Sequence, residues 1–404
     1  MTSLIGHASL YREALRFPSF QKLLIGQGLS MAGDAVCLAA LPVAMLHSGF
    51  SGWIFGLVMA AVGLGSVIGA LAGGMLADRG SAKHILIATD AARGAAQIAA
   101  AMLMVFGAPS WSLVLVYLAF GIGIGVSRPC TQVLLVSLLP KHALVAGNGA
   151  LNFLDNLVAI VFPATLGVLV ILWDPVWGVV IDGITFFGAA LFTALLPSDD
   201  GKLQSGDELS IREALRGLTV IAGNPELSLG FVATVIVNVL CFPVFLVVAP
   251  YAVSDRFSDT MWGVCLAASG VGACIGSVIT VLVAGHRHLK VLAPACGLLL
   301  CAAMGLLGMG SSAWMAVLGA AFIGVVEASW LTGWATAMQT QSPEERLGKV
   351  VAVDTLVTSG VHPFIYLAGG IVGESVGYSD TLIITAFIGA IGTAAVSLAA
   401  VRRT

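Results

Sequence analysis

Charged residues are scarce in this 404-residue sequence: Asp, Glu, Lys and Arg together make up 10% of it, whereas a soluble domain carries about 25%. Apolar residues make up 58%, and a soluble fold of this size cannot bury so much apolar surface and still expose a polar surface to water. The composition therefore excludes a water-soluble globular protein and predicts an integral membrane protein. The net charge of −3 argues against nucleic acid as a partner.

The sequence also lacks the patterns of enzymes and of cofactor sites. It has no Gly-rich loop ending in Gly-Lys-Ser/Thr to cradle phosphates, so ATP is not the expected energy source. No His, Cys or Glu cluster has metal-ligand spacing, and the polar loops are too short to hold an enzyme site. The 7 cysteines all fall in apolar segments and are interpreted as small apolar residues rather than ligands or disulfides. We therefore expect no enzyme activity, no metal and no cofactor.

Long apolar runs, in contrast, are abundant. A helix needs roughly 20 mostly apolar residues to cross the hydrocarbon of a membrane. Short turn-like breaks, such as Gly107-Ala108-Pro109 and Gly377-Tyr378, divide the apolar runs into pieces of this length. The pattern predicts an all-α membrane protein with twelve transmembrane helices, at residues 20–47, 53–77, 85–107, 111–138, 143–172, 177–196, 226–253, 262–284, 290–310, 314–338, 349–373 and 378–400.

The cations predict how these helices are oriented. Every Lys and Arg except Arg128 and Arg256 lies in or beside the N-terminus, the loops that follow even-numbered helices, or the C-terminus. Because positive loops stay on the cytoplasmic side, both termini are predicted to be cytoplasmic. Six tryptophans fall at the opposite ends of the predicted helices, as an interfacial belt would: Trp53, Trp111, Trp173, Trp177, Trp262 and Trp314.

An internal repeat predicts two similar halves. The glycines of the second predicted helix recur 207 residues later in the eighth: Gly56, Gly63, Gly65 and Gly69 match Gly263, Gly270, Gly272 and Gly276. One long polar loop lies between the halves. The expected organisation is an N-terminal segment, a six-helix bundle, a central cytoplasmic loop, a second six-helix bundle and a tail, at residues 1–19, 20–196, 197–225, 226–400 and 401–404. Parallel repeats of this kind suit two bundles that rock about a central site.

The loop after the second predicted helix carries a family resemblance. It reads Gly74-Met-Leu-Ala-Asp78-Arg79-Gly80, followed by Lys83, and resembles the signature of the major facilitator superfamily of transporters. The resemblance covers essentially the whole chain. It implies alternating access and a cytoplasmic gate formed by Gly74, Asp78, Arg79, Lys83, Asp90 and Arg93, of which Asp90 and Arg93 are spaced to pair on one helix face. For Lys83, a purely topological role is the favoured alternative.

Three further segments and one proline narrow the resemblance. The segments from Phe20 to Asp34, Thr89 to Arg93, and Leu139 to Asn148, together with Pro129, are similar to a subgroup that contains the enterobactin exporter and the macrolide-efflux pumps. This subgroup consists of proton antiporters that export drugs or siderophores. It implies a multi-pass protein of the bacterial inner membrane.

Ionisable residues inside predicted helices are the main functional candidates, because charge within a bilayer is costly. Five lie near mid-depth: Asp34, Arg128, Asp155, Glu327 and His362. We expect Asp34 to pair with Arg128 and Asp155 to compete for the same Arg, which would leave one carboxylate free to take a proton. The alternative is a salt bridge that only fixes helix register.

The other candidates have equally open alternatives. Glu327 is either a proton carrier or a side chain that reaches a watery cavity, and His362 is either a carrier or a packed, hydrogen-bonded group. Asn152, Asn156 and Asn238 are expected to line the cavity, although Asn152 and Asn156 also suit hydrogen bonds across helices. Trp330 is either part of an aromatic wall or a packing residue.

The predicted function is proton-coupled export of an amphipathic small molecule, such as a drug, an antibiotic, a siderophore or a secondary metabolite. The expected partners are this cargo, protons and the lipid bilayer, and the expected state is a monomer. Two alternatives remain: uptake of a small polar nutrient, and an uncoupled lipid scramblase or sensor on the same fold.

Overall fold

The computed structural model describes residues 14–79, 81–162, 173–197, 211–283 and 289–401. Within these ranges the secondary structure is helical, with no strand. Ten of the described helices are long and apolar enough to cross a membrane. The expectation of an all-α, multi-pass membrane protein is therefore confirmed.

Apart from the C-terminal end of α6, the described ends of the long helices lie within five residues of the predicted ones. The first half contains α2 (Pro18–His47), α3 (Gly52–Arg79), α4 (Ala82–Val105), α5 (Ser110–Leu138), the short 3-10 turn η1 (Lys141–Ala143), α6 (Leu144–Phe162) and α8 (Val176–Ala194). The second half contains α9 (Ile211–Gly223), α10 (Pro225–Thr234), the π-helical η3 (Val235–Cys241), α11 (Phe242–Arg256), α12 (Asp259–Val283), α13 (Leu289–Met309), α14 (Ala313–Gln341), α15 (Glu344–Val376) and α16 (Tyr378–Val401).

Two of the twelve predicted spans are not among the ten. One is α4, whose hydropathy is lowered by Lys83, Asp90 and Arg93. The other is α6, which is described only as far as Phe162. The rest of its predicted span, residues 163–172, lies outside the described residues, as do residues 1–13 and residues 198–210 of the predicted central loop.

Local sequence explains where several helices begin and end. Gly107 and Gly377 have positive φ angles of 65° and 112°, a backbone conformation that side chains other than glycine's rarely adopt. They terminate α4 and α15. At the start of α10, the Asn224 side chain accepts hydrogen bonds from the backbone N–H groups of Glu226 and Leu227, at 2.9 and 3.3 Å, as an N-cap does.

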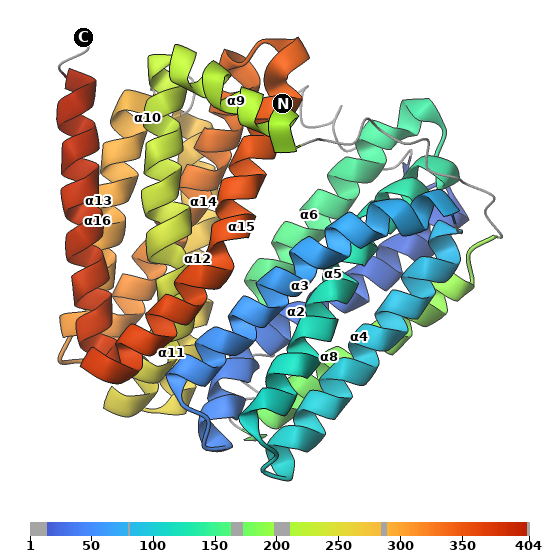
Figure 1. Ribbon diagram of the computed structural model, residues 1–404, viewed down its shortest axis with the longest axis horizontal. Helices are drawn as coiled ribbons and strands as arrows, with labels where there is room; N and C mark the ends of the chain where they lie inside the picture. The colour runs from blue at the N-terminus through green and yellow to red at the C-terminus, as the bar shows by residue number, and fades with distance from the viewer. Residues whose placement is uncertain (1–13, 80, 163–172, 198–210, 284–288, 402–404) are drawn as a thin grey trace. The chain divides into compact units, whose positions relative to one another are not determined.

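The chain divides into two compact units. The first comprises Met1–Ala44 and Ala61–Asp207, and the second comprises Met45–Ala60 and Glu208–Thr404. In the first unit α4 packs against α5 and α8, and in the second α14 packs against α12 and α13 (Figure 1). The amphipathic helix α9 packs on α15, where a Cβ added at Gly217 would lie 2.2 Å from the carbonyl oxygen of Lys349.

The repeated glycines allow close contact between helices in both units. A Cβ added at Gly69 of α3 would lie 2.1 Å from the carbonyl oxygen of Ile122 in α5. At Gly276 of α12 it would lie 2.3 Å from the carbonyl oxygen of Val325 in α14. Each glycine therefore allows two helix backbones to touch, as small residues do in membrane proteins.

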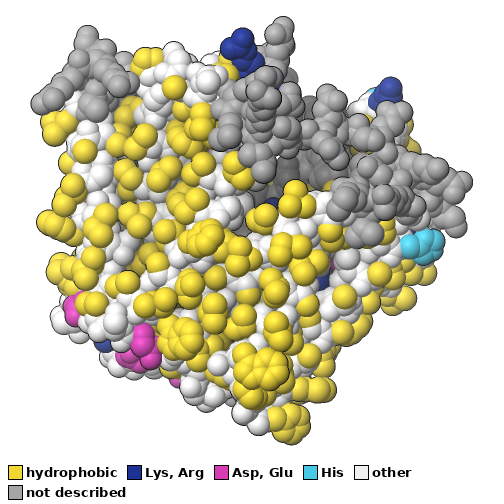
Figure 2. Space-filling model, viewed as in Figure 1, with side chains coloured by type: hydrophobic (Ala, Val, Ile, Leu, Met, Phe, Trp, Pro, Cys, Tyr) yellow, Lys and Arg dark blue, Asp and Glu magenta, His cyan; other side chains and the backbone are white. Residues whose placement is uncertain are grey.

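The outward-facing side chains suit a lipid environment. Large apolar residues are exposed on many helices, and Leu71, Phe106 and Phe387 are 73%, 82% and 67% exposed. Figure 2 shows hydrophobic side chains spread over the visible face, with acidic side chains gathered near its lower edge. Exposed apolar surface on this scale is unfavourable in water and matches a protein surrounded by lipid.

Candidate functional site: a charged cluster in the first unit

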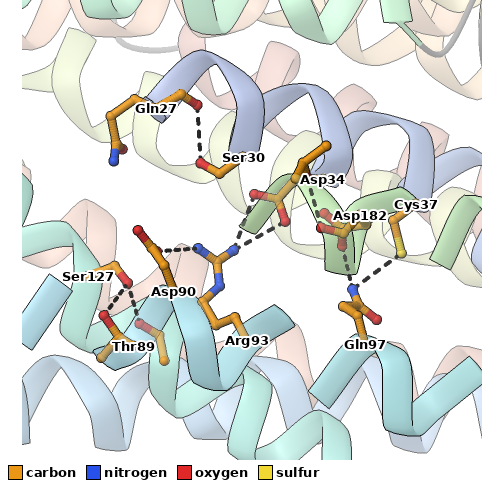
Figure 3. Close-up of polar contacts among 12 residues, drawn as sticks. Gln27, Ser30, Asp34, Cys37, Thr89, Asp90, Arg93, Gln97, Ser127 and Asp182 are labelled. Atoms are coloured by element: carbon orange, nitrogen blue, oxygen red, sulfur yellow. Dashed lines mark hydrogen bonds and ion pairs between the residues drawn. The ribbon is translucent and has the colours of Figure 1, made fainter. Parts of the chain in front are cut away.

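Arg93 occupies the centre of a charged cluster in the first unit (Figure 3). It lies near the middle of α4, and its side chain is only 8% exposed. Its Nη2 atom donates to both carboxylate oxygens of Asp34 in α2, each at 3.2 Å. Its Nη1 atom lies 4.0 Å from Oδ1 of Asp90, one helical turn earlier in α4. One guanidinium therefore has two carboxylate neighbours.

Aromatic rings hold this guanidinium in place. Its central carbon lies 3.9 Å from the ring centre of Phe186 in α8 and 4.9 Å from that of Phe120 in α5. Both distances are in the range of cation–π attraction. Gly123 of α5 makes room for the Arg93 stem, because a Cβ there would lie 2.6 Å from Arg93 Cγ. The cation is thus fixed by packing as well as by charge.

A second polar network continues one turn further along α4. The Gln97 side-chain amide donates to Oδ2 of Asp182 in α8 at 2.5 Å and to Cys37 Sγ at 3.5 Å. Its carbonyl oxygen accepts a hydrogen bond from the Tyr117 hydroxyl at 3.2 Å. Gln97, Asp182 and Tyr117 are all buried. The charged cluster therefore has a sealed polar extension between α4, α5 and α8.

Asp34 is the accessible member of the cluster. Its side chain is 43% exposed although it lies near the middle of α2, whereas that of Asp90 is 2% exposed. Leu38, one turn away on the same face of α2, is 44% exposed. The Asp34 carboxylate can therefore meet a proton or a ligand while its partner Arg93 stays buried.

The cluster contains more acidic groups than cations. The carboxyl groups of Asp34 and Asp90 contact the guanidinium of Arg93, and that of Asp182 lies one helical turn away, with no ion pair among the described residues. Three of their buried polar atoms have no hydrogen-bond partner among the described residues: Asp90 Oδ2, Arg93 Nε and Asp182 Oδ1. Buried charge in this excess is unfavourable, so the arrangement favours exchange of partners or of protons.

The structure assigns Asp34 a different partner from the expected one. We expected Arg128, but the ion pair is with Arg93. Arg128 and Asp155 are both exposed, and neither forms an ion pair within the part of the chain that the structure describes. The side chains of Asn152 and Asn156 lie outside the described set.

Most of the cluster was missed by the sequence reasoning. The sequence analysis places Asp90 and Arg93 in the cytoplasmic gate, as a pair on one helix face. Their spacing with Gln97, at positions i, i+3 and i+7, places all three on one helix face, and this signal was available. Asp182 and Tyr117 gave no such signal, because only packing shows that they meet Gln97.

The lysines near the predicted gate bind the end of a helix. Lys83 is buried, and its ammonium donates to the carbonyl oxygen of Leu196, while Lys22 donates to that of Leu195 at 3.1 Å. These carbonyls lie at the C-terminal end of α8, where cations are favoured. For Gly74, Asp78 and Arg79 the structure describes the helical backbone but not the side chains.

The two ionisable candidates of the second unit, Glu327 and His362, lie in different surroundings. Glu327 of α14 is partly buried, and within the described residues no hydrogen bond or ion pair reaches its carboxylate. His362 of α15 lies beside Asn238 of η3, and its Nε2 atom is 2.8 Å from the Asn238 backbone oxygen. Glu327 and His362 are therefore not joined by a direct contact.

The contact of His362 follows from an irregular helix. In the π-helical η3 the N–H of Phe242 bonds to the carbonyl of Val237, five residues earlier. The carbonyl of Asn238 would next need the N–H of residue 243, but Pro243 has none. Since a carbonyl only accepts, Nε2 of His362 carries the hydrogen and supplies the missing donor. His362 thus matches its hydrogen-bonded alternative.

Trp330 lies in the interior of the second unit. It stacks on Trp334 with ring centres 6.3 Å apart and planes 6° apart, and both rings are buried. The Trp330 indole donates to Thr234 at 3.2 Å, and that of Trp334 donates to Asp354 at 2.8 Å. This placement matches the packing alternative rather than an open aromatic wall.

Comparison with known proteins agrees with the helical architecture. The model of the family described as Major Facilitator Superfamily matches residues 23–365. No curated protein matches the chain significantly.

Several solved transporter structures share the fold. The crystal structure of the nucleoside transporter NupG superposes with a TM-score of 0.76 at 14% identity, covering 94% of this chain and 98% of that one. A D-xylose-proton symporter gives 0.66 at 15% identity, covering 92% and 96%. A bacterial homolog of the human lysosomal transporter Spinster, in an inward-facing and occupied conformation, gives 0.69 at 13% identity, covering 97% of each chain.

Proposed function

The chain belongs to the major facilitator superfamily and is a transporter rather than an enzyme, and from this premise we propose that it exports an amphipathic small molecule by alternating access, driven by protons. The observation that carries the proposal is the ion pair between the accessible Asp34 and the buried Arg93. The proposed cargo class includes drugs, antibiotics, siderophores and secondary metabolites, in line with the resemblance to the enterobactin and macrolide exporters.

The proposed topology has twelve membrane-spanning helices in two six-helix bundles, with both termini in the cytoplasm of a bacterium. The ten long apolar helices support it. For α4, the burial of Lys83, Asp90 and Arg93 supports a span as well, because its charges are covered by protein rather than by lipid.

Asp34 is proposed to bind the proton and the cargo in turn. A proton that reaches the carboxylate neutralises it and weakens its bond to Arg93, because the charge-assisted hydrogen bonds of the pair need an ionised acceptor. Loss of the proton restores the pair. Cargo that contacts Asp34 competes with the proton, and this competition couples the two fluxes.

The surroundings of Asp34 support an amphipathic cargo. The accessible face of α2 presents the Asp34 carboxylate next to the exposed side chain of Leu38. One polar anchor beside apolar surface suits a ligand that is apolar with one polar or cationic group. A small polar nutrient would need several converging polar groups instead.

Accumulation in cells tests the proposal. Cells that express the transporter are loaded with a panel of fluorescent amphipathic dyes and macrolides, with and without an uncoupler of the proton gradient. Wild type is expected to lower the accumulation of at least one compound, and the uncoupler and Asp34→Asn are each expected to abolish this effect. Asp380→Asn, the same change at an exposed residue of α16, is the matched control and is expected to behave as wild type.

Three outcomes would contradict this proposal. Export that persists in Asp34→Asn removes the proposed role of Asp34. Accumulation above that of cells without the protein indicates uptake, the first alternative. Movement of fluorescent lipid in reconstituted vesicles without a pH gradient indicates a scramblase, the second alternative.

A further inference from the structure

Asp182 is a fully buried acid with no cation bound to it. Its relative exposure is 0%, and within the described residues no ion pair reaches its carboxyl group. One oxygen, Oδ2, accepts a hydrogen bond from the Gln97 amide, and the other, Oδ1, has no partner. Figure 3 shows it next to Cys37, between Asp34 and Gln97.

The free oxygen lies against the backbone of α2. A Cβ added at Gly33 would be 2.5 Å from Asp182 Oδ1 and 2.0 Å from Thr185 Oγ1. Gly33 therefore lets α8 bring Asp182 next to the residue that precedes Asp34. Any side chain at position 33 would fill this space.

An ionised carboxylate in this position would be strongly unfavourable. A buried carboxylate is tolerated when a cation pairs with it or when several strong donors bind it, and the donors beside Asp182 are the Gln97 amide and the weakly donating Cys37 thiol. Arg93 binds Asp34 and contacts Asp90 instead. A neutral carboxylic acid needs no counter-ion and keeps the Gln97 hydrogen bond.

We propose that Asp182 is a second proton-binding site, which holds a proton while Asp34 is paired with Arg93. When the pair opens, the proton leaves the Asp182 oxygen and binds an Asp34 oxygen, so that Asp34 becomes neutral and Asp182 becomes the counter-ion of Arg93. One O–H bond breaks and one forms, and the net charge of the cluster stays the same. This transfer step rests on the proposed function, whereas the resting proton on Asp182 does not.

The arrangement of α4 and α8 suits this exchange. Arg93 and Gln97 are one turn apart on α4, and their contacts on α8 are Phe186 and Asp182, also one turn apart. The guanidinium is thus one helical turn away from Asp182 along the same interface. The titratable and charged groups that face Asp182 are Asp34 and Cys37 of α2, Arg93 of α4 and Tyr117 of α5.

Infrared spectroscopy tests the resting proton directly. The C=O stretch of a protonated carboxylic acid is separate from the bands of ionised carboxylates, and it is recorded for the full chain in lipid nanodiscs over a series of pH values. The probe is the proton itself, so no cargo is needed. Wild type is expected to show a carboxylic-acid band at neutral pH that Asp182→Asn lacks. An identical spectrum in Asp182→Asn would overturn the proposal.

Gln97→Leu provides a second readout that does not remove Asp182. It deletes the hydrogen bond to Oδ2, so the same band is expected to move to higher wavenumber without losing intensity. A band that does not move would contradict the assignment even if Asp182→Asn failed to fold. Asp182→Asn is expected to unfold at the same temperature as wild type, because the amide is as large as a neutral carboxylic acid and is also uncharged. If Asp182 were instead an ionised carboxylate with a structural role, the same substitution would lower the unfolding temperature.

Asp34→Asn tests the link to Arg93. Removing the negative charge at position 34 favours ionisation of Asp182, so the Asp182 band is expected to disappear at lower pH than in wild type. An unchanged titration would overturn the transfer step while leaving the resting proton in place. Failure of proton-coupled export in cells would instead overturn the proposed function and leave the infrared result standing.

Discussion

At the scale of single residues, the cluster depends on the chemistry of arginine. The planar guanidinium of Arg93 donates to both oxygens of Asp34 while its face contacts Phe186. A lysine ammonium cannot do both, because it is a compact charge without a flat face. The shape of the cation is therefore expected to matter as much as its charge.

Arg93→Lys tests this dependence on shape. It keeps the charge but loses the stacking and one of the two hydrogen bonds to Asp34, and we expect export to fall at least about tenfold, which corresponds to about 1.4 kcal/mol. Export is measured by dye accumulation in cells at equal amounts of protein in the membrane. Arg346→Lys, at an exposed residue of α15, should have no effect, and equal export by Arg93→Lys would contradict the role of the planar group.

The contacts of a single residue, Arg256, also explain an exception to the rule that the cations lie on the predicted cytoplasmic side. Arg256 is the one cation that the sequence places in a loop on the non-cytoplasmic side. Its guanidinium donates to the carbonyl oxygens of Leu307 and Gly308 at 2.9 and 2.8 Å, at the C-terminal end of α13. A cation satisfies the free carbonyls at a helix end, so Arg256 has a structural reason to be there.

At the scale of helices, the repeated glycines set how closely neighbours pack. Gly69→Ala in α3 and Gly276→Ala in α12 each add a methyl group where the space is already filled by a carbonyl oxygen of the facing helix. We expect each variant to lose about 1–3 kcal/mol of stability, the usual effect of overpacking. The measurement is the thermal unfolding temperature in detergent.

Gly305 and Gly348 supply the controls for this prediction. They are also helical, but a Cβ at either position would meet nothing within 4 Å. Alanine there is expected to leave the unfolding temperature unchanged or to raise it, because it restricts the unfolded chain. If all four variants unfold alike, close backbone contact is not what the repeat preserves.

The π-helical turn of η3 is the other feature at this scale. His362→Phe removes the donor that binds the Asn238 carbonyl, and we expect faster amide hydrogen exchange in residues 235–242, because a buried carbonyl without a partner destabilises the turn. His362→Gln keeps an N–H donor and is expected to restore most of the protection. Equal exchange in both variants would show that the hydrogen bond does not stabilise η3.

How much of this could be predicted from the sequence differs between the helices and the site. Helix positions follow from the lengths of the apolar runs and from turn residues such as Gly107 and Gly377. Asp34 stands out because it is a charge in an apolar run. Its partner could not be predicted, because Arg93 and Arg128 both lie on helices near α2 in the expected fold. The choice between them depends on how α4 is rotated, which Gly123 and Phe186 determine through packing.

At the scale of the whole molecule, ionisable groups are distributed unequally between the two units. The first unit contains a connected cluster that joins α2, α4, α5 and α8. The second unit contains Glu327 and His362 without a direct contact and a stacked pair of tryptophans in its interior. Proton binding is therefore expected to depend on the first unit, whereas the proposed alternating access involves both units.

Proton movement in reconstituted vesicles is the most direct test of the central claim, that the pair of Asp34 and Arg93 couples cargo to protons. Purified protein is placed in liposomes that contain a pH-sensitive dye, and a compound identified by the accumulation assay is added to one side. Wild type and Asp380→Asn are expected to move protons in the direction opposite to the cargo, whereas Asp34→Asn is expected to move none. Cargo-driven proton movement by Asp34→Asn at the wild-type rate would contradict the account.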